Sequence, residues 1–373
     1  MWEELRDRFD VSVLVTSRNA FDLDGLGLEQ IPARSLRNLL PRGRPGDFAM
    51  GLTGDRYRGA EAAFERADIV HTEELGYWHS GDAAARRPES GFKLVVTTWE
   101  TIPLAAAFRN RWARVYRERV VGAADLFLPT TERARDALLL EGVPEDRVEV
   151  CYPGIDSERF SAAAQASPTR VHLTVSPGRL VWEKGHQDVM RALAAFRDGL
   201  VPAPSAPVRL LIIGSGPEEA RLREHARELG LAECVEFRSV PYAEMPDLYA
   251  KASCMVLASL PSAACSRYLG DLPRCFWEEQ FGMVLAEAIA AGLPIVASDS
   301  GAIPEVADEA ASYFSPGSWL ELARRLAEGP LAAAPGTRVE HPRELVERYS
   351  TTAAAERLAA AYERVLEPAS ARS

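Results

Sequence analysis

Short apolar runs alternate with amphipathic segments along almost the whole chain. The apolar runs predict buried strands over 11–16, 68–72, 92–98, 126–129, 148–152, 171–176, 208–213, 235–237, 255–258 and 295–297. Helical spacing of apolar residues predicts helices over 2–9, 60–67, 104–121, 132–141, 186–196, 218–229, 243–250, 283–291, 319–328 and 351–365. Strands that alternate with helices are typical of parallel, doubly wound sheets, so the pattern predicts an α/β fold.

The segment 161–169, SAAAQASPT, separates two such series, because it is rich in Ala, Ser and Pro and lacks periodicity. We therefore predict two doubly wound, Rossmann-like domains, residues 1–160 and 170–345, with ligands beyond the carboxyl ends of their strands. Residues 18–60 are rich in Gly, Pro and Arg and predict irregular loops and short helices. The first domain opens on a helix-like segment instead of the usual strand, so we expect its first strand and the following loop to be missing.

The amino-acid composition excludes several classes of binding partner and several kinds of structure for this chain. The 373 residues carry a formal net charge of -11, which argues against nucleic acid, because phosphate contacts dominate such binding. The five cysteines show no CxxC spacing, which indicates free thiols in a reducing compartment and not a disulfide framework or zinc site. The charged first residues and the lack of any apolar run of about 18 residues predict neither a signal peptide nor a membrane span. We therefore expect a cytoplasmic protein.

Two glutamates mark the stretch 277–305. Glu279 and Glu287 have seven residues between them, and Gly282 stands at the entrance of the helix that carries Glu287. A helix entrance offers unpaired N–H groups that suit a phosphate. One carboxylate is expected to bind sugar hydroxyls and the other a ribose. The alternative is a buried helix with a surface glutamate near each end.

A cationic pair follows the first strand of the second domain. Arg179 and Lys184 lie five positions apart in SPGRLVWEKGH, and Gly178 and Gly185 permit close approach of the backbone. Only three of the 43 Lys and Arg residues are lysines, so a lysine beside a strand end suggests a specific role. An ammonium and a guanidinium could together hold a diphosphate and stabilise it as it departs. The alternative is a pair of surface cations that cap a turn.

These segments resemble the retaining glycosyltransferases of family 4, which have the two-domain GT-B fold. The resemblance covers about residues 67–365. It rests on GRLVWEKGH (178–186), LLIIGSGPE (210–218), EEQFGMVLAEAIAAGLPIVAS (278–298) and GAIPEV (301–306). It implies that residues 351–373 cross back to the first domain as its last helix.

The resemblance also implies roles for individual residues. Glu279 would lie near the hydroxyls of the transferred sugar, Glu287 would bind the ribose, and Arg179 and Lys184 would bind the diphosphate. The whole implied donor site is Gly178, Arg179, Lys184, Gly214, Glu279, Phe281, Gly282, Met283, Val284 and Glu287. The implied reaction moves a hexose from a UDP- or GDP-sugar to an unknown acceptor with retention of configuration. It needs neither a metal nor a cofactor.

Other residues of the amino-terminal half are weaker candidates. Glu100 stands where many relatives carry a histidine and is expected to help place the acceptor; alternatively it caps the following helix. His71 is either a hydrogen-bonded structural histidine or a catalytic group. The DxD-like pair Asp22 and Asp24 lies in a loop and is not expected to bind metal.

The helix over 104–121 carries arginines at 109, 111, 114, 117 and 119. They could give a weak peripheral contact with anionic lipid, but they are spread around the helix, which favours a solvated surface. Two rival functions remain. One is another GT-B enzyme, an epimerase or a phosphorylase with a pyridoxal lysine. The other is a non-catalytic or partner-dependent nucleotide-sugar-binding subunit, which the missing strand would suit.

Overall fold

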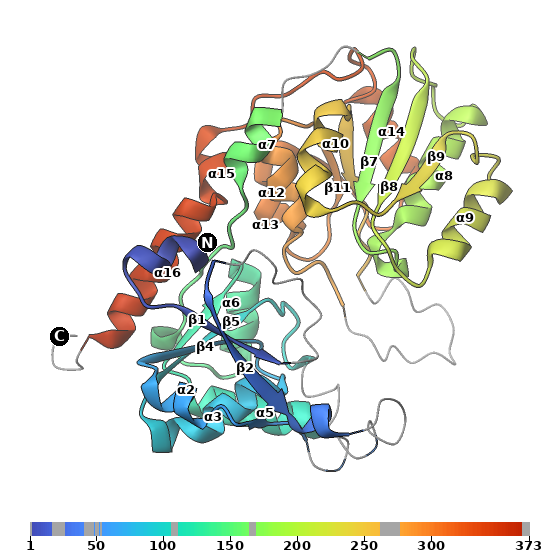
Figure 1. Ribbon diagram of the computed structural model, residues 1–373. Coiled ribbons are helices and arrows are strands. Elements are labelled where there is room, and N and C mark those ends of the chain that lie inside the picture. Colours follow the sequence, from blue (N-terminus) through green and yellow to red (C-terminus); the bar gives the residue numbers. More distant parts are fainter. Residues whose placement is uncertain are drawn as a thin grey trace. The chain divides into compact units, whose positions relative to one another are not determined.

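The computed structural model describes residues 2–16, 27–40, 48, 52, 54–105, 111–163, 169–261 and 277–367. The chain forms two compact units (Figure 1), which consist of Met1–Gly154 with Thr351–Ser373, and of Ile155–Ser350. We call them unit 1 and unit 2. The chain therefore passes between the units twice, and its last segment belongs to the same unit as its first.

Unit 1 contains the first six strands and the last helix. Its elements are η1 (Trp2–Asp7), β1 (Ser12–Thr16), β2 (Glu29–Ser35), η2 (Leu36–Leu39), β3 (Tyr57–Arg58), α2 (Glu61–Arg66), β4 (Ile69–Glu73), α3 (Trp78–Ser90), β5 (Lys93–Thr98), α5 (Arg111–Ala123), β6 (Leu126–Pro129), α6 (Glu132–Leu140), η3 (Glu145–Arg147) and α16 (Thr351–Leu366). The strands of the described residues form two sheets, β1-β2-β3 and the parallel sheet β4-β5-β6. This differs from the single doubly wound sheet that the sequence suggested for this unit.

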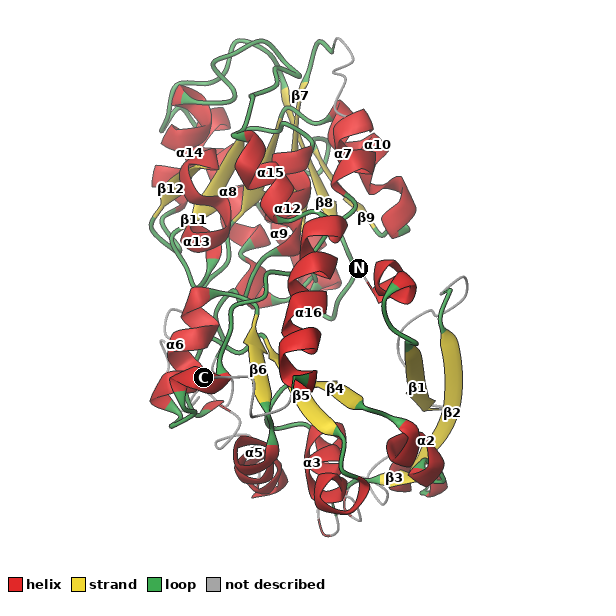
Figure 2. Cartoon of the chain, turned by 90° about the vertical axis from the view of Figure 1, so that its left-hand side faces the viewer, coloured by secondary structure: helices red, strands yellow, loops and turns green. Residues whose placement is uncertain are grey.

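The β4-β5-β6 sheet is covered on both faces. Successive side chains of a strand point to opposite faces, and β5 follows this rule. Leu94 and Val96 pack into a core with α2 and α3, whereas Val95 packs against Leu358 and Tyr362 of α16. Figure 2 shows α16 alongside β5 and β6. The last helix is therefore part of the core of unit 1.

Unit 2 is a sheet with helices on both faces. Its elements are α7 (Ser157–Ala163), β7 (His172–Pro177), η4 (Trp182–Lys184), α8 (His186–Arg197), β8 (Val208–Ile213), α9 (Glu219–Glu228), β9 (Val235–Arg238), η5 (Tyr242–Glu244), α10 (Met245–Lys251), β10 (Cys254–Leu257), α12 (Met283–Ala290), β11 (Ile295–Ser298), α13 (Ile303–Ala307), η6 (Asp308–Ala310), β12 (Ala311–Phe314), α14 (Trp319–Glu328) and α15 (Arg343–Arg348). The six strands are parallel in the order β12-β11-β10-β7-β8-β9. Numbered along unit 2, this is 6-5-4-1-2-3, the doubly wound order of Rossmann folds.

Several predicted elements differ from the structure. The strand predicted over 148–152 is wrong, since only a single bridge joins Val148 to Phe127 there. The predicted linker 161–169 begins inside α7. The sequence also gave no sign of β2, which lies in the stretch predicted as irregular loops, or of α3.

Candidate functional site

The sheet of unit 2 has a topological switch point between β7 and β10. The strand order continues through β8 and β9 on one side and through β11 and β12 on the other. Ligands of doubly wound sheets bind at the carboxyl ends of the strands at such a point. Arg179 and Lys184 follow β7, Ser259 follows β10, and Glu279 stands shortly before α12. The cationic and acidic residues predicted from the sequence thus come from neighbouring crossovers.

Lys184 and Glu279 form a direct ion pair at this point. Lys184 Nζ lies 2.8 Å from Glu279 Oε1 and 2.6 Å from Oε2, and only 14% and 7% of the two side chains are exposed. The Ser259 hydroxyl donates to Glu279 Oε2 at 2.5 Å. The ammonium also lies 4.9 Å from the centre of the Trp277 ring, a cation–π arrangement. The carboxylate is therefore fixed by a cation and a hydroxyl from two other segments.

Glycines allow the backbone to bring these segments together. Gly185 has φ +68°, and a Cβ there would lie 1.9 Å from the carbonyl oxygen of Ala258. Gly301 has φ +57°, and its Cβ would lie 2.2 Å from the carbonyl oxygen of Glu279. That carbonyl accepts a hydrogen bond from Ala302 N at 2.8 Å. The loop after β11 thus packs directly on the backbone of Glu279.

The GSG turn after β8 supports the loop that carries Arg179. A Cβ at Gly214 would lie 2.0 Å from the carbonyl oxygen of Gly178, so a side chain at this position would push the two loops apart. Gly178 N donates to the carbonyl of Ile213 at 2.9 Å. In the structure, Gly214 therefore has a packing role beside the predicted cations.

The Arg179 side chain is exposed, and it has no hydrogen-bond or ion-pair partner among the described residues. Its backbone carbonyl lies 3.2 Å from His186 Nε2, and the other ring nitrogen, Nδ1, lies 2.9 Å from Ser176 Oγ. Burial lowers the pKa of His186 to about 4, so the ring is neutral near pH 7. Nε2–H then donates to the Arg179 carbonyl, and Nδ1 accepts from the Ser176 hydroxyl. These two hydrogen bonds fix the backbone of the loop that carries Arg179 and leave its guanidinium available to a ligand.

The entrance of α12 has the geometry of an anion-binding helix start. Gly282 adopts φ +79°, and a Cβ there would contact two leucine side chains at 3.0 and 3.2 Å. Phe281 is buried edge-on against Tyr349, with ring centroids 5.4 Å apart. Met283 and Val284 are half-buried. Because the first N–H groups of a helix lack intrahelical acceptors, they are available to a phosphate here.

Glu287 has different partners from Glu279. It is 4% exposed, and its Oε2 accepts a hydrogen bond from the Tyr249 hydroxyl at 3.0 Å. Burial raises the pKa of Glu287 to about 7, while hydrogen bonds from Tyr249 and Tyr242 act to lower it. No hydrogen bond or ion pair joins Glu287 to Lys184 within the described chain.

In unit 1, Glu100 follows β5. Its Oε1 accepts a hydrogen bond from Ile102 N at 3.2 Å, which is the kind of local contact expected of a capping residue. It also lines a cavity of about 10 Å³ together with Glu74, Thr98 and Glu141, a volume that fits a single water molecule.

His71 is fully satisfied inside unit 1. Its Nδ1 lies 2.6 Å from the Tyr362 hydroxyl and its Nε2 2.7 Å from Thr97 Oγ1. Burial lowers the pKa of His71 to about 3. These contacts favour the structural interpretation. Asp22 and Asp24 lie outside the described residues. The described residues contain no group of three or more His, Cys, Asp or Glu side chains that could hold a metal ion.

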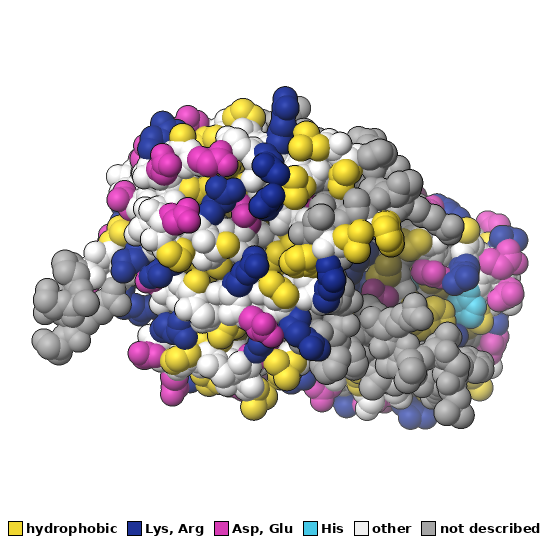
Figure 3. Space-filling model, turned by 90° about the horizontal axis from the view of Figure 1, so that it is seen from below, with side chains coloured by type: hydrophobic (Ala, Val, Ile, Leu, Met, Phe, Trp, Pro, Cys, Tyr) yellow, Lys and Arg dark blue, Asp and Glu magenta, His cyan; other side chains and the backbone are white. Residues whose placement is uncertain are grey.

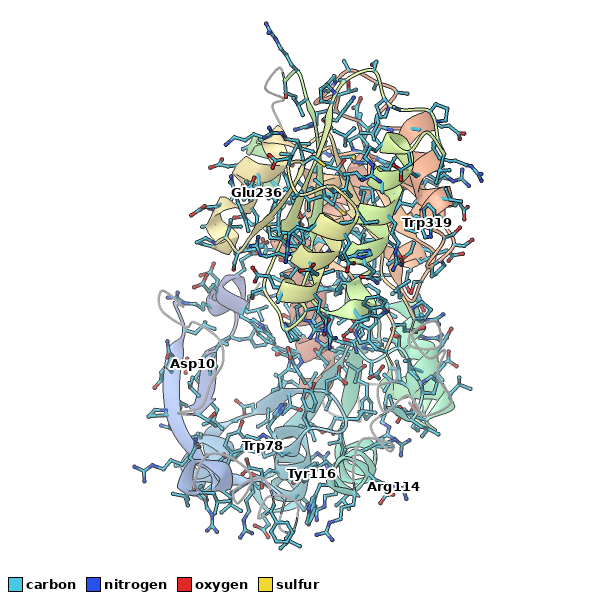
Figure 4. All side chains as sticks on the ribbon, turned by 90° about the vertical axis from the view of Figure 1, so that its right-hand side faces the viewer. Asp10, Trp78, Arg114, Tyr116, Glu236 and Trp319 are labelled. Atoms are coloured by element: carbon cyan, nitrogen blue, oxygen red, sulfur yellow. The ribbon has the colours of Figure 1, made fainter. Side chains whose placement is uncertain are left out.

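The arginine-rich helix α5 turns its aromatic residues inward. Tyr116 packs so closely over Gly81 of α3 that a Cβ added to this glycine would lie 2.3 Å from the tyrosine ring. Trp112 stacks on Tyr116. Arg114 is exposed at the outer edge (Figure 4), and Arg117 pairs with Glu141. Basic, acidic and hydrophobic side chains are interspersed on the face of α2, α3 and α5 (Figure 3). None of the described helices is long and apolar enough to cross a membrane.

Three contributing residues were not predicted: Ser259, Tyr249 and Tyr242. Ser259 directly follows a run of apolar residues, and a small polar residue at the end of a buried strand could have indicated it. The tyrosines reach Glu287 from a different crossover, so only the tertiary structure reveals them.

Comparisons with known proteins match both halves of the chain to families of glycosyltransferases. The family described as Glycosyl transferases group 1 matches residues 157–329, and Glycosyltransferase Family 4 matches residues 1–159. A D-inositol 3-phosphate glycosyltransferase of Streptomyces bingchenggensis is 28% identical over 319 residues, which are 78% of this chain and 62% of that protein. One of the same name from Thermobispora bispora is 27% identical over 95% of this chain and 85% of its own length. The chain thus spans less than two thirds of the first of these relatives.

Solved structures share the fold. A glycosyltransferase of Rickettsia africae matches with a TM-score of 0.68 and 16% identity, over 95% of this chain and 90% of that one. Anabaena HepE with UDP and glucose matches with a TM-score of 0.67 and 17% identity, over 94% of this chain and 91% of that one. Sucrose-phosphate synthase of Thermosynechococcus elongatus matches with a TM-score of 0.70 and 19% identity, over 98% of this chain and 91% of that one. The predicted GT-B fold is confirmed. The two family matches together cover residues 1–329, and the chain belongs to the group 1 glycosyl transferases of glycosyltransferase family 4.

Proposed function

We propose that this chain is a retaining, metal-independent hexosyltransferase that moves a sugar from a nucleoside-diphosphate sugar to an acceptor hydroxyl. The contact between Lys184 and Glu279 at the switch point of unit 2 carries the proposal. In this contact an ammonium that would bind the diphosphate lies beside a carboxylate that would accept sugar hydroxyls. Anabaena HepE has been solved with UDP and with UDP-glucose, so a UDP-sugar is the first donor to test and a GDP-sugar the second.

Each residue has a role in this proposal. Lys184 and Arg179 bind the diphosphate and stabilise the charge that develops on it as it leaves. The N–H groups at the entrance of α12 bind the same anion. Glu279 accepts hydrogen bonds from hydroxyls of the transferred sugar, and Glu287 accepts them from the ribose. Since Lys184 is paired with Glu279 before the donor binds, it exchanges part of this contact for phosphate oxygens.

The reaction needs no protein nucleophile. The bond between the anomeric carbon and the diphosphate oxygen breaks, and the bond to the acceptor oxygen forms on the same face. The departing diphosphate takes the proton of the acceptor hydroxyl. Cationic stabilisation of the leaving group therefore supplies the catalysis, which is why no metal is required in this scheme.

The acceptor and the surroundings of the enzyme form the finer part of the proposal. Glu100 helps place the acceptor, and D-inositol 3-phosphate is the first acceptor to test, because the similar curated proteins are named for it. The cysteines Cys151, Cys234 and Cys254 are free, which suits a reducing cytoplasm. The exposed arginines of α5 give at most a weak contact with anionic lipid.

A donor panel followed by product analysis tests the proposal. Thermal shift with UDP-, GDP- and ADP-sugars identifies the donor, and NMR of the product gives its anomeric configuration. We expect stabilisation by one nucleotide family, a product of retained configuration and unchanged turnover in EDTA. Inversion of configuration would overturn the retaining mechanism. Donor binding without transfer to any acceptor would instead favour a partner-dependent binding subunit.

A further inference from the structure

Within the described residues, Glu287 is a buried carboxylate that forms no ion pair with a cation. It lies in α12, and only 4% of it is exposed. Its hydrogen-bond donors are two tyrosine hydroxyls, Tyr249 of α10 at 3.0 Å and Tyr242 of η5. Buried carboxylates are normally paired with a cation or a metal. Among the described residues, the Glu287 carboxylate has only hydroxyl donors as partners, and this unusual set of partners needs an explanation.

The two tyrosines differ in exposure. Tyr249 is fully buried, whereas Tyr242 is 52% exposed. The Phe160 ring of α7 packs near both of them, with centroid distances of 5.6 Å to Tyr249 and 6.0 Å to Tyr242. Tyr242 is the first residue of η5, which begins shortly after the carboxyl end of β9, on the ligand-binding edge of the sheet. The carboxylate thus lies between a buried donor and one that faces solvent.

A carboxylate can accept about four hydrogen bonds, and the two tyrosines supply two. The remaining acceptor positions match a ligand with two neighbouring hydroxyl groups. We propose that Tyr249 and Tyr242 are positioning residues, which hold the Glu287 carboxylate charged and oriented to accept hydrogen bonds from both hydroxyls of the nucleotide ribose. The inference rests on the proposed function and deepens it, because it makes the ligand a ribonucleotide and not a 2′-deoxyribonucleotide.

Other charges near α12 do not explain the state of this carboxylate. The causes that act on the pKa of Glu287 are burial, which raises it, and the hydrogen bonds from Tyr249 and Tyr242, which lower it. The charged residues on the neighbouring elements α7, α10, α13 and α15 are Glu158, Arg159, Asp247, Lys251, Glu305, Arg343, Glu344, Glu347 and Arg348. None of them is among these causes, and β11 carries no charged residue. The two hydroxyls are therefore the groups to vary.

The test compares the affinity of the full chain for UDP and for 2′-deoxy-UDP between pH 5.5 and 8.5. The wild-type protein is expected to prefer UDP by about 10-fold or more at pH 8, because a charged acceptor discriminates for a hydroxyl. Its affinity for UDP should fall as the pH drops through about 7. In Tyr249→Phe the lost hydrogen bond no longer lowers the pKa of Glu287, so this fall should begin at higher pH.

Tyr249→Phe should also reduce the preference for UDP to about 3-fold or less. Tyr242→Phe should also reduce the preference for UDP and move the fall in UDP affinity to higher pH. Its position is half-exposed and tolerates the loss of a hydroxyl. Tyr313→Phe is the control, because its hydroxyl donates to the carbonyl of Asp308 and not to Glu287. It should retain the wild-type preference and pH dependence.

Two results overturn the inference and leave the proposed function intact. One is an equal loss of affinity for both nucleotides in Tyr249→Phe, which indicates a merely structural tyrosine. The other is a wild-type protein that binds UDP without preference over 2′-deoxy-UDP. Absence of binding to UDP and GDP at every pH contradicts the proposed function and the inference together.

Discussion

At the scale of single residues, the central lysine and glutamate of the site neutralise each other before any ligand arrives. The ammonium of Lys184 is bound by both oxygens of Glu279, so neither charge is left unpaired in a largely buried position. A diphosphate can replace the carboxylate as the partner of the lysine, and the released oxygens of Glu279 can then accept hydroxyl groups. Buried charges are costly without partners, and in this exchange the ammonium always faces an anion while the carboxylate always accepts hydrogen bonds.

Replacing Lys184 by alanine should lower turnover by roughly 10²-fold or more, because the leaving group loses one stabilising contact. Steady-state kinetics with the best donor measures this. Lys251→Ala is the matched control, since this lysine of α10 is exposed and makes no contact with Glu279. Wild-type turnover in the Lys184 variant would remove the residue from its assigned role.

The raised pKa of Glu287 predicts a pH dependence of stability. Its pKa is about 7 in the folded chain and near the ordinary value of 4.5 when unfolded, so the folded state binds the extra proton between these values. The free energy of unfolding should therefore fall as the pH rises from about 4.5 to above 7, by on the order of 3 kcal/mol from this group.

Urea unfolding without nucleotide at pH 5 and pH 8 measures the effect. Glu287→Gln keeps the shape of the side chain and cannot titrate, so its stability should fall less between the two pH values than that of the wild type. An identical fall in both proteins would show that Glu287 does not titrate in this range.

The sequence indicated the charged members of the site better than their partners. Lys184 was a candidate because lysine is rare in this chain, and Glu279 because of its spacing from Glu287. Ser259 and Tyr249 approach the two carboxylates from other crossovers. Their positions depend on which strands are neighbours, and a single sequence does not specify that order.

At the scale of elements, turns without side chains join the crossovers into one site. Gly185 and Gly301 each bring a loop into backbone contact with a neighbouring segment. The precise position of Glu279 therefore depends on the loop after β11 as much as on α12. Substitutions in this loop should affect the donor site without touching the donor.

Gly301→Ala should destabilise unit 2 and weaken donor binding by about 10-fold. The strained φ alone costs about 1–3 kcal/mol, and the contact at 2.2 Å with the carbonyl of Glu279 must also be relieved by a backbone shift. Gly199→Ala is the control, because Gly199 has φ +69° with nothing within 4 Å of its Cβ. Denaturant unfolding and donor titration compare the two variants. Equal effects on donor affinity would contradict a role of the loop in placing Glu279.

The elements that the sequence did not reveal break local rules. Helix α3 contains Gly81 and Pro88, which are both unfavourable inside helices. Gly81 is nevertheless required, since the Tyr116 ring of α5 occupies the space of its side chain. Strand β2 contains Pro32 and is mostly polar, and it forms through pairing with β1. In both cases a tertiary contact overrides the local preference.

At the scale of the whole molecule, the alternation of strands and helices was sufficient to predict the fold class. The sheet of unit 2 has the full doubly wound order, and most of its strands lie where apolar runs predicted them. Unit 1 is harder to predict, because its strands form two small sheets and the described residues include a strand of low hydrophobicity. Apolar runs predict buried strands, but they do not say which sheet a strand joins.

Leu358→Ala tests whether the two units are energetically separate. This α16 side chain is 1% exposed in the core of unit 1, so its loss should cost about 2–5 kcal/mol. Hydrogen exchange should then increase in Met1–Gly154, while the dissociation constant of UDP stays unchanged. Leu322→Ala, fully buried in α14 of unit 2, is the counterpart. It should increase exchange in Ile155–Ser350. Faster exchange spread equally over both units in each variant would contradict separate cores.

The return of α16 to unit 1 has a consequence for the newly made chain on the ribosome. The face of β5 and β6 formed by Val95, Leu126 and Leu128 is covered by residues 355–365, which are synthesised more than 200 residues later. Domains usually fold in the order in which they emerge, but here the second unit is fully synthesised before the first can close. During translation the part of this apolar face that α16 covers remains exposed, and it is the surface on which we expect chaperones to bind.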